Sequence, residues 1–100
     1  MKAWKAAEYQ AAKALGGKRV LLSGGGGTGT TGDVELPGWL VEVKYRKFFA
    51  VWSMFLEVEQ KAKTEGKNAL LILKEKNQPG ELAVMRIEYF KEAKDVTGTN

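Results

Sequence analysis

The sequence predicts one α/β domain in which a central mixed β-sheet is flanked by helices. Segments with the 3.6-residue periodicity of helices alternate along the chain with short valine- and leucine-rich segments typical of strands. The length of 100 residues normally corresponds to one domain, and 44% hydrophobic with 28% charged residues suits a globular protein. We therefore expect residues 1–100 to form a single domain with helices packed on one sheet.

The first half of the chain is predicted to contain one helix and three strands. The helix consists of good helix formers, and Gly16 and Gly17 end it. A glycine-rich segment over 23–32 carries almost no side chains that could pack, so we expect a flexible loop. The predicted bounds are 2–15 for the helix and 18–22, 33–36 and 39–45 for the strands, the last two joined by a Pro-Gly turn.

The second half is predicted to contain a long helix, two strands and a short closing helix. The long helix has a broad apolar face, and Gly66 ends it. The predicted bounds are 48–65 and 88–94 for the helices and 69–74 and 81–87 for the strands.

Composition excludes several kinds of active site. The chain has no cysteine and no histidine, which excludes thiolate and histidine metal sites and serine–histidine triads. Any bound metal would therefore be a hard cation such as magnesium or manganese, held by oxygen atoms. The net charge of +4 and the pI of about 9.4 favour polyanionic partners. We find neither a membrane-spanning apolar run nor a secretory signal and expect a cytoplasmic location, which would be the host cytoplasm for a viral protein.

Charged residues in a predicted central strand form the candidate site. Side chains alternate along a strand, so Glu42 and Lys44 should face the same way. A hairpin could bring Asp33 beside Glu42, and a divalent cation would offset the repulsion between the two carboxylates. Lys44 could then orient water or stabilise charge developing at phosphorus. Glu8, on the same helix face as Trp4 and Leu15, could complete the cluster.

Simpler interpretations of these residues stay open. An E-x-K sequence on a strand is common and often forms a solvated ion pair. Glu8 alone could be a helix residue at the margin of the core.

The ordered set resembles the PD-(D/E)xK nuclease superfamily, and within it the small archaeal-type and phage Holliday junction resolvases. The residues that carry the resemblance are Glu8 on the first helix, the glycine-rich loop, Gly32-Asp33 and Glu42-Val43-Lys44. The later segments "EVKYRK", "GKNALLIL" and "ELAVMRIEYF" are also similar to phage members. The chain departs from the family pattern at Gly32, which stands where the family name has proline, and at Leu22, where archaeal relatives often carry arginine.

The resemblance implies a restriction-endonuclease-like core and a homodimer that makes paired nicks in four-way DNA junctions. The implied cofactor is magnesium, with manganese as a substitute. The implied metal ligands are Asp33, Glu42 and the Val43 carbonyl, with Glu8 as a further candidate. Lys44 is the implied catalytic lysine, and Glu8 the helix acid of the catalytic set.

Basic and hydroxyl side chains around this set are candidate DNA contacts, since phosphate binding supplies affinity without sequence preference. They are Lys18, Arg19, Ser23, Thr28, Thr30, Thr31, Tyr45, Arg46 and Lys47. The loop also contains a literal G-x-G-x-x-G, but a strand follows it where a dinucleotide-binding site needs a helix.

Aromatic residues on the long helix are candidates for a dimer interface, although all of them could instead be core. They are Phe48, Phe49, Trp52 and Phe55. Two other functions stay open. One is a related nuclease acting on other branched or duplex DNA, and the other is a non-catalytic nucleic-acid-binding module.

Overall fold

A computed structural model describes residues 2–21 and 32–98 of the chain. Within these ranges, three helices and five short strands alternate, so the chain is a small mixed α/β protein. It divides into two compact units, Met1–Arg46 with Lys91–Asn100, and Lys47–Phe90. The elements in chain order are α1 (Ala3–Leu15), β1 (Lys18–Arg19), β2 (Val34–Leu36), β3 (Trp39–Val41), α2 (Ala50–Thr64), β4 (Leu71–Leu73), β5 (Leu82–Val84) and α3 (Ile87–Gly98).

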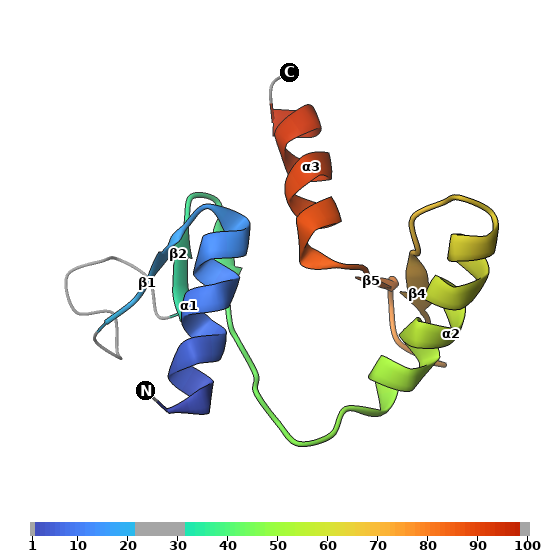
Figure 1. The fold of residues 1–100 in the computed structure, drawn as a ribbon, viewed down its shortest axis with the longest axis horizontal. Helices are drawn as coiled ribbons and strands as arrows, with labels where there is room; N and C mark the ends of the chain where they lie inside the picture. The colour runs from blue at the N-terminus through green and yellow to red at the C-terminus, as the bar shows by residue number, and fades with distance from the viewer. Residues whose placement is uncertain (1, 22–31, 99–100) are drawn as a thin grey trace. The chain divides into compact units, whose positions relative to one another are not determined.

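The first unit is an antiparallel sheet of order β1-β2-β3 with α1 packed against β1 and β2 (Figure 1). Small and branched side chains fill the contact, and Val34 is fully buried at 0% exposure. The buried side chains of this unit are Ala12, Leu15, Val20, Val34 and Leu36. Alanine at the helix surface allows the close approach of α1 to the sheet that this packing requires.

A two-residue turn sets the register of the β2–β3 hairpin. Leu36 pairs with Trp39 across Pro37-Gly38, and Val34 pairs with Val41. Gly38 has a φ of 84°, which a tight turn with proline before glycine requires and which other residues rarely adopt. The turn thus fixes which residues of the two strands lie opposite each other.

The second unit combines α2 with the antiparallel pair β4–β5. Phe55 on α2 and Ala69 before β4 are its buried hydrophobic side chains. Several large apolar side chains of this unit remain exposed, among them Phe48 at 75% and Trp52 at 57%.

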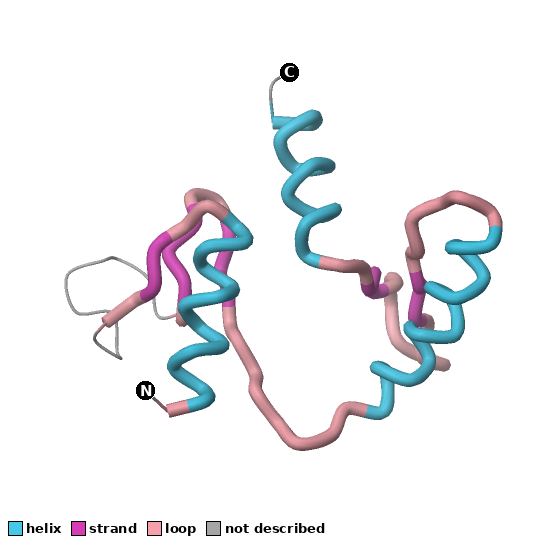
Figure 2. Tube along the Cα trace, in the orientation of Figure 1, coloured by secondary structure: helices cyan, strands magenta, loops and turns pink. Residues whose placement is uncertain are grey.

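The predicted elements are present, but the single mixed sheet is not. The described residues form two separate sheets, of three and of two strands, and every observed strand pair is antiparallel (Figure 2). The strands are also shorter than predicted. The strand predicted over 39–45 ends at Val41, because the next backbone N–H available to β2, that of Val43, is bound by a side chain.

The end of the closing helix also differs from the prediction. The closing helix α3 runs to Gly98 rather than ending at residue 94, since no proline or glycine interrupts it earlier. Residues 23–31 of the expected flexible loop lie outside the described residues. None of the helices in the described ranges is both long and apolar enough to cross a membrane.

Candidate active site

Asp33 is fixed at the open end of the β2–β3 hairpin by its backbone and by its side chain. Its N–H donates to the Val41 carbonyl at 2.7 Å, and its carbonyl accepts from Val20 N–H at 2.9 Å. The Asp33 carboxylate oxygen Oδ2 accepts a hydrogen bond from Val43 N–H at 2.7 Å. The half-buried carboxylate therefore replaces the next backbone hydrogen-bond acceptor of the hairpin and holds the segment after β3 in place.

Gly32 explains how the chain reaches this position. A Cβ added at Gly32 would lie 2.5 Å from the Val41 carbonyl oxygen, closer than any real contact. The backbone before Asp33 therefore packs directly on β3, and only glycine fits. Gly32 was expected to belong to the flexible loop; it is instead a buried residue of the hairpin.

Glu42 and Lys44 follow β3 on the exposed side of an extended segment. Lys44 Nζ lies 3.4 Å from Glu42 Oε2, so the two side chains face the same way. Both are solvated, with exposures of 61% for Lys44 and 52% for Glu42. Val34 pairs with Val41, and Asp33 comes directly before Val34 in the chain while Glu42 comes directly after Val41. One acid from each arm and the lysine thus gather at one end of the hairpin.

Glu8 has a different partner from the one expected. Its Oε1 accepts a hydrogen bond from Arg19 Nε at 2.7 Å, and the side chains are only 13% and 11% exposed. The Arg19 guanidinium carbon also lies 4.9 Å from the Tyr9 ring centroid and 6.0 Å from that of Trp4. The hydrogen bond to Glu8 and the nearby Tyr9 raise the pKa of Arg19.

The oxygen atoms of these acids are of the kind that binds magnesium, but the three side chains do not form one cluster. Carboxylate and carbonyl oxygens are the ligands that Mg²⁺ prefers. Within residues 2–21 and 32–98, however, no three acidic side chains come close enough together to hold a metal ion. Asp33 and Glu42 flank the paired ends of β2 and β3, whereas Glu8 is bound to Arg19.

The expected DNA contacts differ in accessibility. Lys18, Tyr45, Arg46 and Lys47 are exposed, as a phosphate contact requires. Arg19 is not, because it is enclosed between Glu8 and the α1 aromatic rings. The hydroxyl residues Ser23, Thr28, Thr30 and Thr31 lie outside the described residues.

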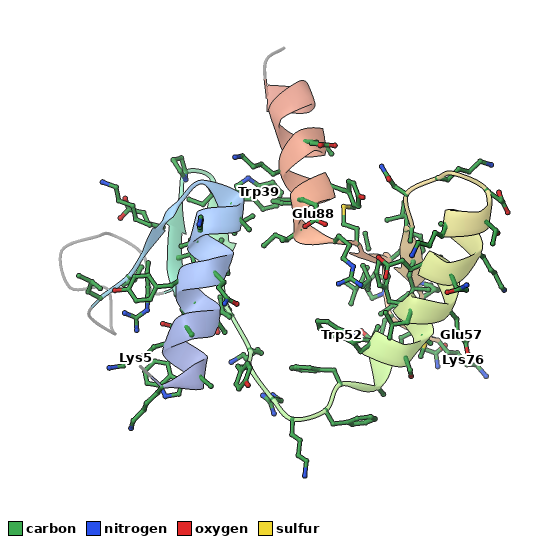
Figure 3. The ribbon with its side chains drawn as sticks, in the orientation of Figure 1. Lys5, Trp39, Trp52, Glu57, Lys76 and Glu88 are labelled. Atoms are coloured by element: carbon green, nitrogen blue, oxygen red, sulfur yellow. The ribbon has the colours of Figure 1, made fainter. Side chains whose placement is uncertain are left out.

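The aromatic residues of the expected dimer interface differ in burial. Phe55 is 6% exposed and belongs to the core of the second unit, so the expectation that it contacts a partner is corrected. Phe49 is half-buried at the residue before α2, whereas Phe48 and Trp52 are exposed. Figure 3 shows the Trp52 side chain projecting from the first turns of α2.

A second ion pair was not anticipated from the sequence. Arg86 donates from Nε to Glu59 Oε2 at 2.7 Å and from Nη2 to Oε1 at 2.6 Å, a two-point pair within the second unit. These bonds from Arg86 lower the pKa of Glu59. The position of Glu59 among the apolar residues of α2 is a signal that could have indicated a paired carboxylate, but nothing in the sequence singled out Arg86.

Comparison with known proteins does not assign this fold or site. No protein-family model matches the chain, and neither a curated protein nor a solved structure does.

Proposed function

We propose that this protein is a magnesium-dependent, structure-selective DNA endonuclease of the Holliday junction resolvase type. The observation that carries the proposal is the placement of Asp33, Glu42 and Lys44 at one end of a single hairpin. An acid on each arm, with a lysine paired to one of them, is a residue set that can support metal-assisted phosphodiester hydrolysis. The resemblance of the ordered sequence to the PD-(D/E)xK superfamily supports the same assignment.

In this proposal the Asp33 and Glu42 carboxylates and the Val43 carbonyl hold the cation. When bound, magnesium supplies positive charge that favours attack at phosphorus. Asp33 is well suited to this task because its hydrogen bond to Val43 N–H fixes the carboxylate relative to the Val43 peptide.

Lys44 acts on the reacting groups. The Lys44 side chain is 61% exposed, so its ammonium can reach a phosphate that binds over the hairpin end. There it orients the attacking water and stabilises the negative charge that develops on the phosphate oxygens. The water oxygen forms the new bond to phosphorus, the bond to the 3′ oxygen breaks, and that oxygen takes up a proton. The products carry a 3′-hydroxyl and a 5′-phosphate.

Four-way DNA junctions are the proposed substrate, and a second copy of the chain is the proposed partner. Exposed Lys18, Arg46 and Lys47 supply phosphate contacts that do not depend on sequence. Exposed Phe48 and Trp52 supply an apolar surface for the second copy. A twofold dimer would present two sites, as paired nicking of a junction requires.

A non-catalytic DNA-binding module is the second candidate. The exposed Glu42–Lys44 pair favours it, because such a pair also occurs on ordinary solvated strands.

The experiment that tests the proposal is a nicking assay on a synthetic four-way junction beside linear duplex of the same sequences. We expect symmetric nicks in the junction with magnesium and none with chelator. Tight junction binding without nicks in magnesium or manganese would instead identify a binding module. Equal cutting of junction and duplex would retain the nuclease and reject the junction.

A further inference from the structure

The carboxylates of the candidate site all have donor partners in the DNA-free protein. Asp33 accepts from Val43 N–H, Glu42 pairs with Lys44, and Glu8 pairs with Arg19. Three carboxylates brought together without a cation would repel one another. Arg19 and Lys44 offset the charges of Glu8 and Glu42, and the Val43 N–H gives Asp33 a hydrogen-bond donor. The three pairs differ in exposure, and that between Glu8 and Arg19 is the most enclosed.

Arg19 joins the helix acid to the strand beside Asp33. It lies on β1 opposite Val34, and the next residue, Val20, donates its N–H to the Asp33 carbonyl. Arg19 thus stands between Glu8 on α1 and the hairpin that carries Asp33.

The guanidinium is also suited to binding phosphate. It presents five N–H donors in a fixed fork that matches a carboxylate or a phosphate equally well. The bond to Glu8 is made by Nε, and the Trp4 and Tyr9 rings beside the guanidinium are each 45% exposed. A phosphate that approaches beside these part-exposed rings would meet a guanidinium already oriented by them.

We propose that Arg19 exchanges partners when DNA binds. In the DNA-free protein it holds Glu8, and in the complex a backbone phosphate takes the guanidinium and releases Glu8 to join Asp33 and Glu42. Arg19 is then a positioning residue that couples substrate binding to completion of the metal site. The inference rests on the proposed nuclease function and adds a regulatory step to it.

The first test measures Mn²⁺ binding to the DNA-free protein by titration calorimetry. Arg19→Gln frees Glu8, so we expect Mn²⁺ to bind at least about fivefold more tightly than to wild type. Lys18→Gln is the matched control, because it removes the same charge from the neighbouring exposed position on β1. The gain should disappear in Glu8→Gln/Arg19→Gln. Equal Mn²⁺ affinity in Arg19→Gln and Lys18→Gln would overturn the proposal.

The second test measures junction binding without metal, by fluorescence anisotropy. Glu8→Gln frees Arg19 for phosphate and should tighten binding at least about fivefold more than Glu35→Gln. Glu35 is an exposed acid on β2, so its variant controls for the loss of one negative charge. In an Arg19→Gln background the two variants should behave alike. An equal effect of Glu8→Gln and Glu35→Gln in the parent protein would also contradict the exchange.

The two readouts separate this inference from the proposed function. Neither affinity measurement requires strand cleavage. Nicking without these differences in affinity would therefore reject the partner exchange of Arg19 and leave the proposed nuclease function standing. Both differences without nicking would support the exchange and reject the nuclease. If Arg19→Gln fails to fold by circular dichroism, Arg19→Lys replaces it, and its Mn²⁺ affinity should lie above that of wild type.

Discussion

At Gly32 the backbone passes so close to β3 that one methyl group would collide with the Val41 carbonyl oxygen, 2.5 Å away. This contact places Asp33 at the hairpin end, where its carboxylate accepts from Val43 N–H. The PD-(D/E)xK motif that the sequence resembles has proline at this position, and the proline ring fixes φ, whereas glycine leaves φ free. Here the absence of a side chain, rather than a fixed φ, positions the acid.

Gly32→Ala should therefore impair the site more than the fold. The added methyl forces the segment away from Val41 and moves the Asp33 carboxylate from Val43 N–H. We expect junction nicking to fall at least about tenfold, since small displacements of catalytic groups are costly. Gly66→Ala is the control, because Gly66 has positive φ but open space around it, in the other unit. Full nicking by folded Gly32→Ala would contradict this role.

Among the elements, α2 shows how a helix face can divide between core and surface. Phe55 is buried at 6% exposure, whereas Trp52, one turn earlier, is 57% exposed. The periodicity of the sequence predicted a broad apolar face but not which part of it the two-stranded β4–β5 sheet would cover. A sheet of two strands is too narrow to bury the whole face of a helix.

Phe55→Ala should destabilise the second unit strongly, and Trp52→Ala should not. Removing a buried phenyl ring costs about 3–5 kcal/mol, whereas truncating an exposed side chain costs below about 1 kcal/mol. Urea unfolding followed by circular dichroism measures both. Equal destabilisation by the two substitutions would show that Phe55 is not the core residue of this helix.

The Glu59–Arg86 pair predicts a pH dependence for the same unit. The bonds from Arg86 lower the Glu59 pKa below its ordinary value of 4.5. A lowered folded-state pKa contributes stability above the unfolded-state value, and that stability is lost as the pH falls through the folded-state value. Glu59→Gln should therefore lower the Tm at pH 7, with the difference from wild type vanishing in acid.

Glu57→Gln is the control for this comparison, because Glu57 is an exposed acid on the same helix. It should leave the Tm nearly unchanged across the pH range. A Glu59→Gln difference in Tm that is constant down to about pH 3 would contradict the ion-pair explanation.

For the whole molecule, the sequence predicted local structure better than it predicted contacts between distant residues. The Pro37-Gly38 turn fixes its register within a few residues, so the hairpin of β2 and β3 could be predicted from the sequence. The Glu8–Arg19 and Glu59–Arg86 pairs could not, because they join residues 11 and 27 positions apart. The arrangement in two sheets likewise depends on which strands pair, and periodicity does not specify pairing.

The exposed aromatic surface predicts association of the whole protein. Sedimentation velocity should give twice the 11.0 kDa mass of one chain, and Phe48→Ala/Trp52→Ala should shift the protein to monomer. Lys76→Ala, an exposed position in the same unit, should leave the dimer intact. A wild-type monomer at the concentration of the nicking assay would contradict the proposed dimer.

The measurement that tests the central claim most directly is the nicking rate of site variants on a four-way junction in magnesium. We expect Asp33→Asn and Lys44→Ala each to lower the rate at least about a hundredfold, with unfolding midpoints close to wild type. Glu35→Gln, at an exposed position on β2, should keep the rate within about threefold of wild type after correction for DNA affinity. Undiminished nicking by Asp33→Asn or Lys44→Ala would show that the hairpin end is not the cleavage site.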